Sequence, residues 1–162
     1  MSNIVKRSDK VAFFGVKNGE SVTFCRMKGF TDISVSRNPK EYARQYVDEE
    51  FERTDVVGYA TSMSYGFDQH VGDPVHEDIA SVHDSEMLGM DAVRSIVVVD
   101  FTREAEGGGF LARKRDFAVI PSSEGGSMDA YTYSGSLKTA GDTVVGTATS
   151  EDGWESCVFV EE

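Results

Sequence analysis

The chain has 162 residues, which suits one ordinary domain and is too short for two generous ones. Hydrophobic residues make up 40% and charged residues 27%, a globular composition that excludes a disordered tail. The net charge of −12 excludes a conventional DNA-binding protein, because neutralisation of phosphates supplies most of the affinity of such proteins. This net charge does not exclude a surface past which DNA slides without adhering.

The charge is unevenly distributed along the chain. Residues 1–40 hold eight basic and three acidic residues, whereas residues 41–162 hold eight basic and twenty-five acidic ones. Net charges of +5 and −17 suggest a complementary contact, either within the fold or between copies of it. No apolar run resembles a signal peptide or reaches the length of a membrane span. We therefore expect a protein that is made and used in the cytoplasm or is released by a route other than secretion.

The first strands are predicted at Val11–Val16, Ser21–Met27 and Phe30–Arg37. The first two are separated by a segment that contains Asn18-Gly19, which predicts a type I′ hairpin turn because both residues tolerate positive φ. Cys25 in the second run and Cys157 near the end of the chain follow no metal-binding spacing. Buried free thiols are expected for them, and a disulfide has no support.

Residues Asn38–Asp55 lack a clean period of 2 or 3.6 and combine charged with aromatic residues. Four apolar or aromatic residues spaced by four, one and four allow a short helix, namely Tyr42, Tyr46, Val47 and Phe51. An extended arm or hairpin fits equally well, and a solvated loop is the remaining alternative. Eighteen residues exceed the usual connection between packed strands, and long ordered excursions are often functional. Tyr, Phe and Arg are also enriched at interfaces, so this segment is a candidate contact arm.

A longer strand is predicted at Val56–Phe67, where large residues alternate with small polar ones. The small-residue face suits a smooth wall as well as a solvent-exposed surface. One helix follows at about Asp73–Leu88, because Asp73 can cap it, Pro74 fits its first position and Gly89 can end it.

The remaining strands are predicted at Arg94–Phe101, Arg113–Ile120, Tyr131–Lys138, Thr143–Ser150 and Trp154–Val160. Glycines 107–109 and residues 122–127 form the flexible connections. No repeat or linker divides the chain, so residues 1–162 are expected to form a single α+β domain that is mainly antiparallel.

The chemistry-bearing residues point to no recognisable reaction. His70, His76 and His83 lie near several carboxylates, but the spacing differs from a zincin helix, in which two histidines are four residues apart. A small metal-binding or enzymatic domain using this cluster remains an alternative of another class, as does a ligand-binding β-sandwich. No nucleophile elbow, phosphate loop or dinucleotide fingerprint is present, so we expect neither an enzyme nor a cofactor.

An ordered series of segments resembles the major tail tube proteins of tailed bacteriophages, of the siphophage type with Gram-positive hosts. It begins with NPKEYARQYVDEEFERTDVVGYATSMSYGFD and continues through DPVHEDIASVHDSEMLG, VRSIVVVDF, KRDFAVIPSSEGGSMDAYTYSGSLKTAGDTVVGTAT and GWESCVFV. The resemblance covers roughly residues 11–160. It implies an antiparallel β-sandwich or half-barrel with one flanking helix.

The resemblance further implies a structural virion protein of the viral tail, assembled in the host cytoplasm. Six copies would form a ring, and stacked hexameric rings would form the conduit for DNA ejection and delivery of the genome to the host cell. Partners would be the chain itself, a tape measure protein and a tail terminator, with viral DNA as passing cargo and no membrane. A tube subunit of a contractile tail, tailocin or injection device, which needs a sheath partner, is the alternative.

Two sets of residues become candidates under this interpretation. Contacts between rings or subunits would use side chains of the predicted arm, namely Tyr42, Arg44, Tyr46, Val47, Glu49, Phe51 and Arg53. The lumen would be lined by some of the carboxylates of Asp68, Asp100, Asp116, Asp129, Asp142 and Glu151. An acidic lumen would keep phosphate from adhering to the wall.

Overall fold

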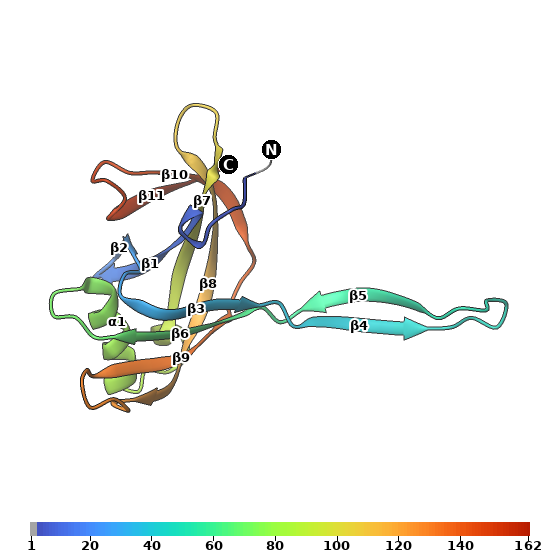
Figure 1. Ribbon diagram of the computed structural model, residues 1–162, viewed down its shortest axis with the longest axis horizontal. Coiled ribbons are helices and arrows are strands. Elements are labelled where there is room, and N and C mark those ends of the chain that lie inside the picture. Colours follow the sequence, from blue (N-terminus) through green and yellow to red (C-terminus); the bar gives the residue numbers. More distant parts are fainter. Residues whose placement is uncertain (1–2) are drawn as a thin grey trace.

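The computed structural model describes residues 3–162 as a β-rich body from which one long hairpin projects (Figure 1). Within these residues there are one α-helix, α1 (Pro74–Asp84), and two short 3-10 helices, η1 (Arg7–Asp9) and η2 (Gly89–Ala92). The strands are β1 (Lys10–Asn18), β2 (Ser21–Arg26), β3 (Phe30–Ser36), β4 (Pro39–Arg44), β5 (Arg53–Tyr59), β6 (Ser62–Asp68), β7 (Val93–Glu104), β8 (Phe110–Glu124), β9 (Thr132–Thr139), β10 (Val144–Thr149) and β11 (Ser156–Glu161).

Six antiparallel strands close into a barrel in the order β8-β7-β1-β2-β11-β10, because β10 pairs with both β11 and β8. Closure gives each of these strands two neighbours and so removes exposed edges. The barrel interior is a dry cluster built around Phe13, Val97 and Val99, none of which is exposed to solvent. Trp154 packs its ring against Phe101, with ring centroids 5.0 Å apart.

A second layer begins at β8, which is long enough to serve two sheets. Its C-terminal half pairs with β9, and the sheet continues through β6 to β3. The inner faces of β3, β6 and β9 turn toward β1, β7 and β8, and the residues between them form the larger core. Fully buried members include Phe14, Phe67, Ile79, Ile96 and Leu137.

Helix α1 packs against this larger core through Val75, Ile79 and Val82, which are completely buried. Its start is fixed by Asp73, whose Oδ1 accepts hydrogen bonds from the backbone N–H groups of Val75 (3.0 Å) and His76 (3.2 Å). Its position on the sheet is fixed by a buried ion pair, in which Arg94 Nε donates to Asp78 Oδ2 at 2.9 Å.

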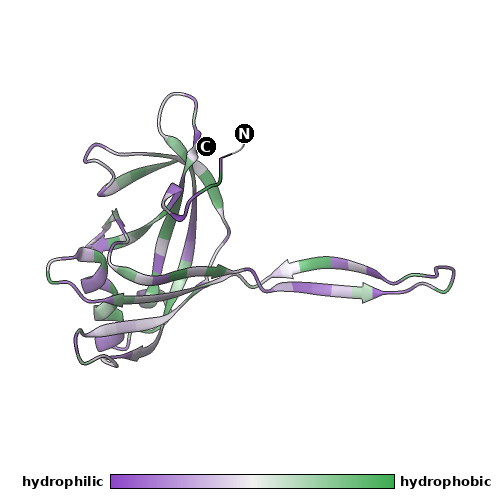
Figure 2. Ribbon diagram, in the orientation of Figure 1, coloured by the Kyte–Doolittle hydropathy of each residue, from purple (hydrophilic) through white to green (hydrophobic). Residues whose placement is uncertain are grey.

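The hairpin of β4 and β5 stands outside both cores. It forms a sheet of two strands only, and nearly every residue in it is exposed. Figure 2 shows hydrophobic segments along β5 and at the hairpin tip, far from the body. The hairpin leaves the body at Asn38, which has a left-handed φ of 45° and whose Nδ2 donates to the carbonyl oxygen of Ala60 at 3.0 Å.

The fold class expected from the sequence is confirmed: the chain is mainly β and antiparallel, with a six-stranded barrel, further strands and a flanking helix. The helix is shorter than the predicted Asp73–Leu88, because it ends at Asp84 and Glu86 takes a positive φ of 47°. The strand predicted to end at Ile120 continues through Pro121, where the register shifts in a bulge.

Two other sequence-based expectations are wrong in detail. The predicted strand Val56–Phe67 is two strands in different sheets, because it is interrupted at Ala60 and Thr61, opposite Asn38 at the base of the hairpin. The turn between β1 and β2 has Gly19 and Glu20 at its centre, since Asn18 pairs with Ser21. Only Gly19 has positive φ there, as a type II′ turn requires, so the predicted type I′ turn does not form.

Candidate assembly surfaces

The structure places the seven contact candidates together on the projecting hairpin. The guanidinium of Arg44 lies over the rings of Tyr42 and Tyr46, 5.0 and 5.8 Å from their centroids. Glu49 pairs with Arg53 at 3.7 Å. Such contacts stiffen the hairpin without burying it.

Apolar side chains on this hairpin are unusually exposed for a water-soluble surface. Val47 and Phe51 at the tip have relative exposures of 108% and 79%. Val56, Val57 and Tyr59 on β5 are 54–63% exposed and were not among the sequence-based candidates. They were missed because the predicted strand Val56–Phe67 joins them to β6. The signal that could have separated them is the length of that predicted strand.

A second surface is a wall of hydroxyl groups on the outer face of β3, β6 and β9. Ser34 pairs with Ser64, which pairs with Ser136, so one serine from each strand stands in a row across the sheet. The hydroxyl oxygens of Ser34 and Ser64 are 2.7 Å apart, and Ser64 Oγ also donates to Asp32 Oδ2 at 3.0 Å. Small side chains that form hydrogen bonds with one another make this face smooth and polar.

The register extends the wall beyond this row. Alternate positions of the three strands carry the further members Ser36, Ser62, Gly66, Asp68, Thr132, Ser134 and Lys138. Sequence reasoning identified the small face of the segment that becomes β6 but missed its partners on β3 and β9. The matching alternation of serines in all three segments is the signal that could have joined them.

The six acidic lumen candidates do not gather on one surface. Asp68 lies on the outer face of β6, and Asp116 accepts a hydrogen bond from Ser95 Oγ on the face of β8 that is turned away from the larger core. Asp100 is buried, with 7% exposure, and hydrogen bonds from Thr102 lower the pKa of its carboxyl group. Exposed loops hold the other three, Asp129, Asp142 and Glu151. A lumen role for these side chains stays a prediction.

The wall also ends in an open edge. β3 pairs with β6 on one side, and none of the described residues pairs with its other side. An exposed edge strand presents unpaired backbone N–H and C=O groups and is suited to pair with another chain.

The three histidines do not converge on a common point. His76 is fully buried, with Nδ1 accepting from the backbone N–H of His70 and Nε2 donating to the Lys28 carbonyl oxygen at 2.6 Å. Nε2 of His83 lies 2.6 Å from the hydroxyl of Tyr65, and burial lowers the pKa of His83. Among residues 3–162, no group of three or more His, Cys, Asp or Glu side chains is placed to hold a metal ion. His76 and His83 are instead buried and each has hydrogen-bond partners of its own, while His70 is exposed.

Both cysteines are free thiols; Cys157 is buried as expected, whereas Cys25 is only half-buried. Burial raises the pKa of Cys157 to about 12 and also raises that of Cys25, so neither thiol is activated. Of the helices in the described part of the chain, none is long and apolar enough to span a membrane.

Comparison with solved structures finds a similar fold in a chain of a prophage baseplate. A chain in the cryo-EM structure of the anti-feeding prophage (AFP) baseplate superposes with a TM-score of 0.51 at 10% identity, covering 90% of this chain and 97% of its own. The PVC extracellular contractile injection system gives two further neighbours, both 12% identical and covering 89% of this chain. Its sheath/tube terminator structure gives a TM-score of 0.47 over 97% of that chain, and its sheath-tube complex gives 0.44 over 92%. No family model matches the chain, and no curated protein matches it in sequence.

Proposed function

We propose that this protein is a structural subunit that assembles with copies of itself into a tail-type tube. The observation that carries the proposal is the hairpin Pro39–Tyr59, which holds Val47, Phe51 and Val57 in solvent far from either core. Exposed apolar side chains do not stabilise an isolated chain. A second copy that covers the hairpin removes their apolar surface from water and so stabilises the assembly.

In the proposed assembly, six copies form a ring and rings stack along one axis. The open edge of β3 pairs with a neighbouring copy, and the hydroxyl wall of β3, β6 and β9 faces the bore. Asp32 and Asp68 on that wall would be repeated in every copy and would repel phosphate. DNA would be the cargo, with a tape measure protein and a tail terminator as partners, and the role would be structural and not enzymatic.

Two particles could use such a tube. The resemblance of the sequence favours a siphophage-type tail, while the fold similarity to the AFP baseplate chain favours a contractile tail, tailocin or injection device. We favour the contractile setting. Co-purification of a sheath-type partner with tubes isolated from the native host would support it, and native tubes that never carry a sheath would support the siphophage-type tail.

Negative-stain electron microscopy of the purified protein at rising concentration tests the tube itself. We expect hollow tubes of constant width, because a head-to-tail contact that does not close produces a filament. Particles that stay small and monodisperse at every concentration would contradict the proposal. Stoichiometric metal in the purified protein would instead favour the rival domain built on the histidines.

A further inference from the structure

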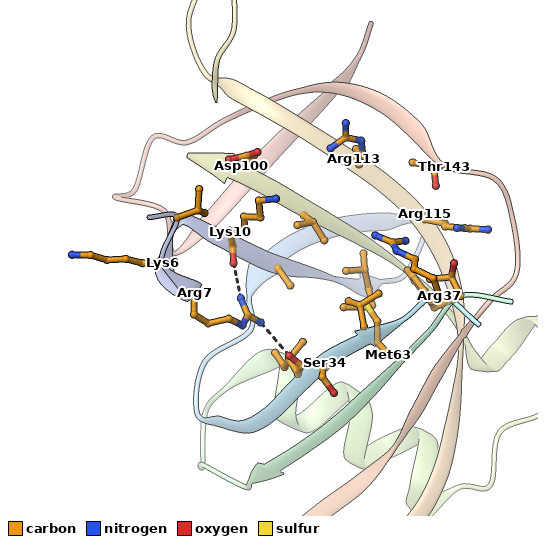
Figure 3. Close-up of a pocket in the computed structure, with 18 residues that line it drawn as sticks. Lys6, Arg7, Lys10, Ser34, Arg37, Met63, Asp100, Arg113, Arg115 and Thr143 are labelled. Carbon is orange, nitrogen blue, oxygen red and sulfur yellow. Dashed lines mark hydrogen bonds between the residues drawn. The ribbon is translucent and has the colours of Figure 1, made fainter. Parts of the chain in front are cut away.

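A groove of about 680 Å³ lies between the two layers of the body, beside the open strand β3 (Figure 3). One wall comes from β1, β7 and β8 and the other from β3 and β6, so the groove continues the space filled by the larger core. Its floor is apolar, formed by side chains such as Ile33, Met63, Ile96, Val98 and Phe117.

The rim of the groove is strongly basic in a protein of net charge −12. Six of the sixteen Lys and Arg residues line it, and Asp100 is its one acidic residue. Within residues 3–162, none of the six side chains forms a salt bridge. The six are Lys6, Arg7, Lys10, Arg37, Arg113 and Arg115. An apolar floor under unneutralised cations fits a segment that is both apolar and acidic.

The tip of the hairpin has that composition. Residues 45–52 carry four carboxylates and no cation, and of these carboxylates only Glu49 has a salt-bridge partner among the described residues. Between the acidic residues stand Val47 and Phe51, which are almost fully exposed. The tip of one copy thus matches the groove in both charge and polarity.

The arrangement of hairpin and groove favours a contact between copies. Arg37 and Arg115 lie at the end of the groove next to the hairpin base, whereas Lys6 and Arg7 lie at the opposite end (Figure 3). The hairpin points away from the body, roughly along β3 and β6 (Figure 1). In a second copy displaced along the hairpin, the end of the groove that carries Lys6 would therefore face the hairpin tip of the first copy. With about ten residues in each arm, the hairpin spans roughly 33 Å.

We propose that the groove receives the hairpin tip of a second copy, residues 45–52. The contact rests on the proposed tube function and names the surface by which successive rings hold one another. Carboxylates of the tip meet the basic rim, and Val47 and Phe51 cover the apolar floor. Because the tip and the groove are different surfaces, two copies in contact still present one free groove and one free tip. Further copies can add at both ends, so the contact propagates along an axis.

Two double charge reversals test the contact. Asp48→Lys/Glu50→Lys reverses the tip, and Lys6→Glu/Arg113→Glu reverses the groove; all four side chains are exposed and have no hydrogen-bond or salt-bridge partner among the described residues. Each variant alone should give at least tenfold less sedimentable polymer than the wild type. An equimolar mixture should restore polymer, because each variant's tip is complementary to the other's groove.

Glu20→Lys/Glu106→Lys changes the net charge by the same amount as the tip variant, at exposed loop positions that belong to neither the tip nor the groove, and should polymerise like the wild type. If both reversals polymerise normally, or if the mixture does not recover, docking of the tip in the groove is overturned while the tube function stands. A wild-type protein that never polymerises would overturn the tube function, and the docking with it.

Discussion

The body and the hairpin obey opposite packing rules although they are one continuous chain. In the body, strands β1 and β6 bury large apolar side chains such as Phe14 and Phe67 completely. In the hairpin, strands β4 and β5 leave Tyr42 and Val57 about half exposed or more. The body is therefore stabilised by its own cores, whereas the hairpin is held by backbone pairing and a few surface contacts and can bury its apolar side chains only against another molecule.

Truncation of one phenylalanine in each region should give the largest difference in stability. Phe67 has 1% exposure and stacks on His76 with ring centroids 4.5 Å apart, so Phe67→Ala should lower the free energy of unfolding by about 3–5 kcal/mol. Phe51→Ala should change it by less than about 0.5 kcal/mol, because Phe51 is exposed. Urea denaturation of the unassembled protein measures both. A comparable loss from the two substitutions would mean that the hairpin tip packs on its own body.

A buried ion pair gives the next largest effect. Arg94 is 4% exposed and its guanidinium donates to Asp78 and to the carbonyl oxygen of Asp91. Arg94→Ala should cost about 3 kcal/mol, because Asp78 would keep a poorly solvated charge without its partner. The matched control is Arg103→Ala, whose side chain is 69% exposed and pairs with Asp100 at 3.7 Å; it should cost less than about 1 kcal/mol. Equal losses of unfolding free energy in the two variants would mean that the buried ion pair stabilises the fold no more than the exposed one does.

The cap of α1 should contribute less. Asp73→Ala removes the acceptor of two backbone N–H groups and should cost about 1 kcal/mol, while Asp73→Asn should retain most of the stability. Thermal denaturation of the two variants checks this order. An Asn variant as unstable as the Ala variant would indicate that the charge, and not the hydrogen bonds, matters at this position.

The smallest effect concerns pH. Burial lowers the pKa of His83 in the folded protein, so the unfolded chain binds more protons as the pH falls through about 6.5. The stabilising contribution of neutral His83 is complete above that pH and is lost progressively below it, down to the lowered pKa. Melting temperatures between pH 8 and pH 5 should fall less steeply in His83→Gln than in the wild type. His70→Gln, at an exposed position, should leave the slope nearly unchanged.

Sequence patterns predicted the parts of this molecule that depend on local rules. Asp73 and Pro74 located the start of the helix, and alternation located β3, β6 and β9. The barrel could not be predicted, because its closure depends on β10 pairing with β8 thirty residues away. The groove was missed for the same reason: Lys6, Arg37 and Arg113 are distant in sequence and meet only through the sheet.

The hairpin continues the line of β3 and β6, and this alignment has a mechanical consequence (Figure 1). Backbone hydrogen bonds between antiparallel strands run across the strands. A pull along the hairpin axis therefore loads the β3–β6 and β6–β9 bonds in shear, all together, and does not unzip them one at a time. Tension applied at the tip is spread over a whole sheet, so such a pull would separate one copy from the next before it tore the hairpin from its own body.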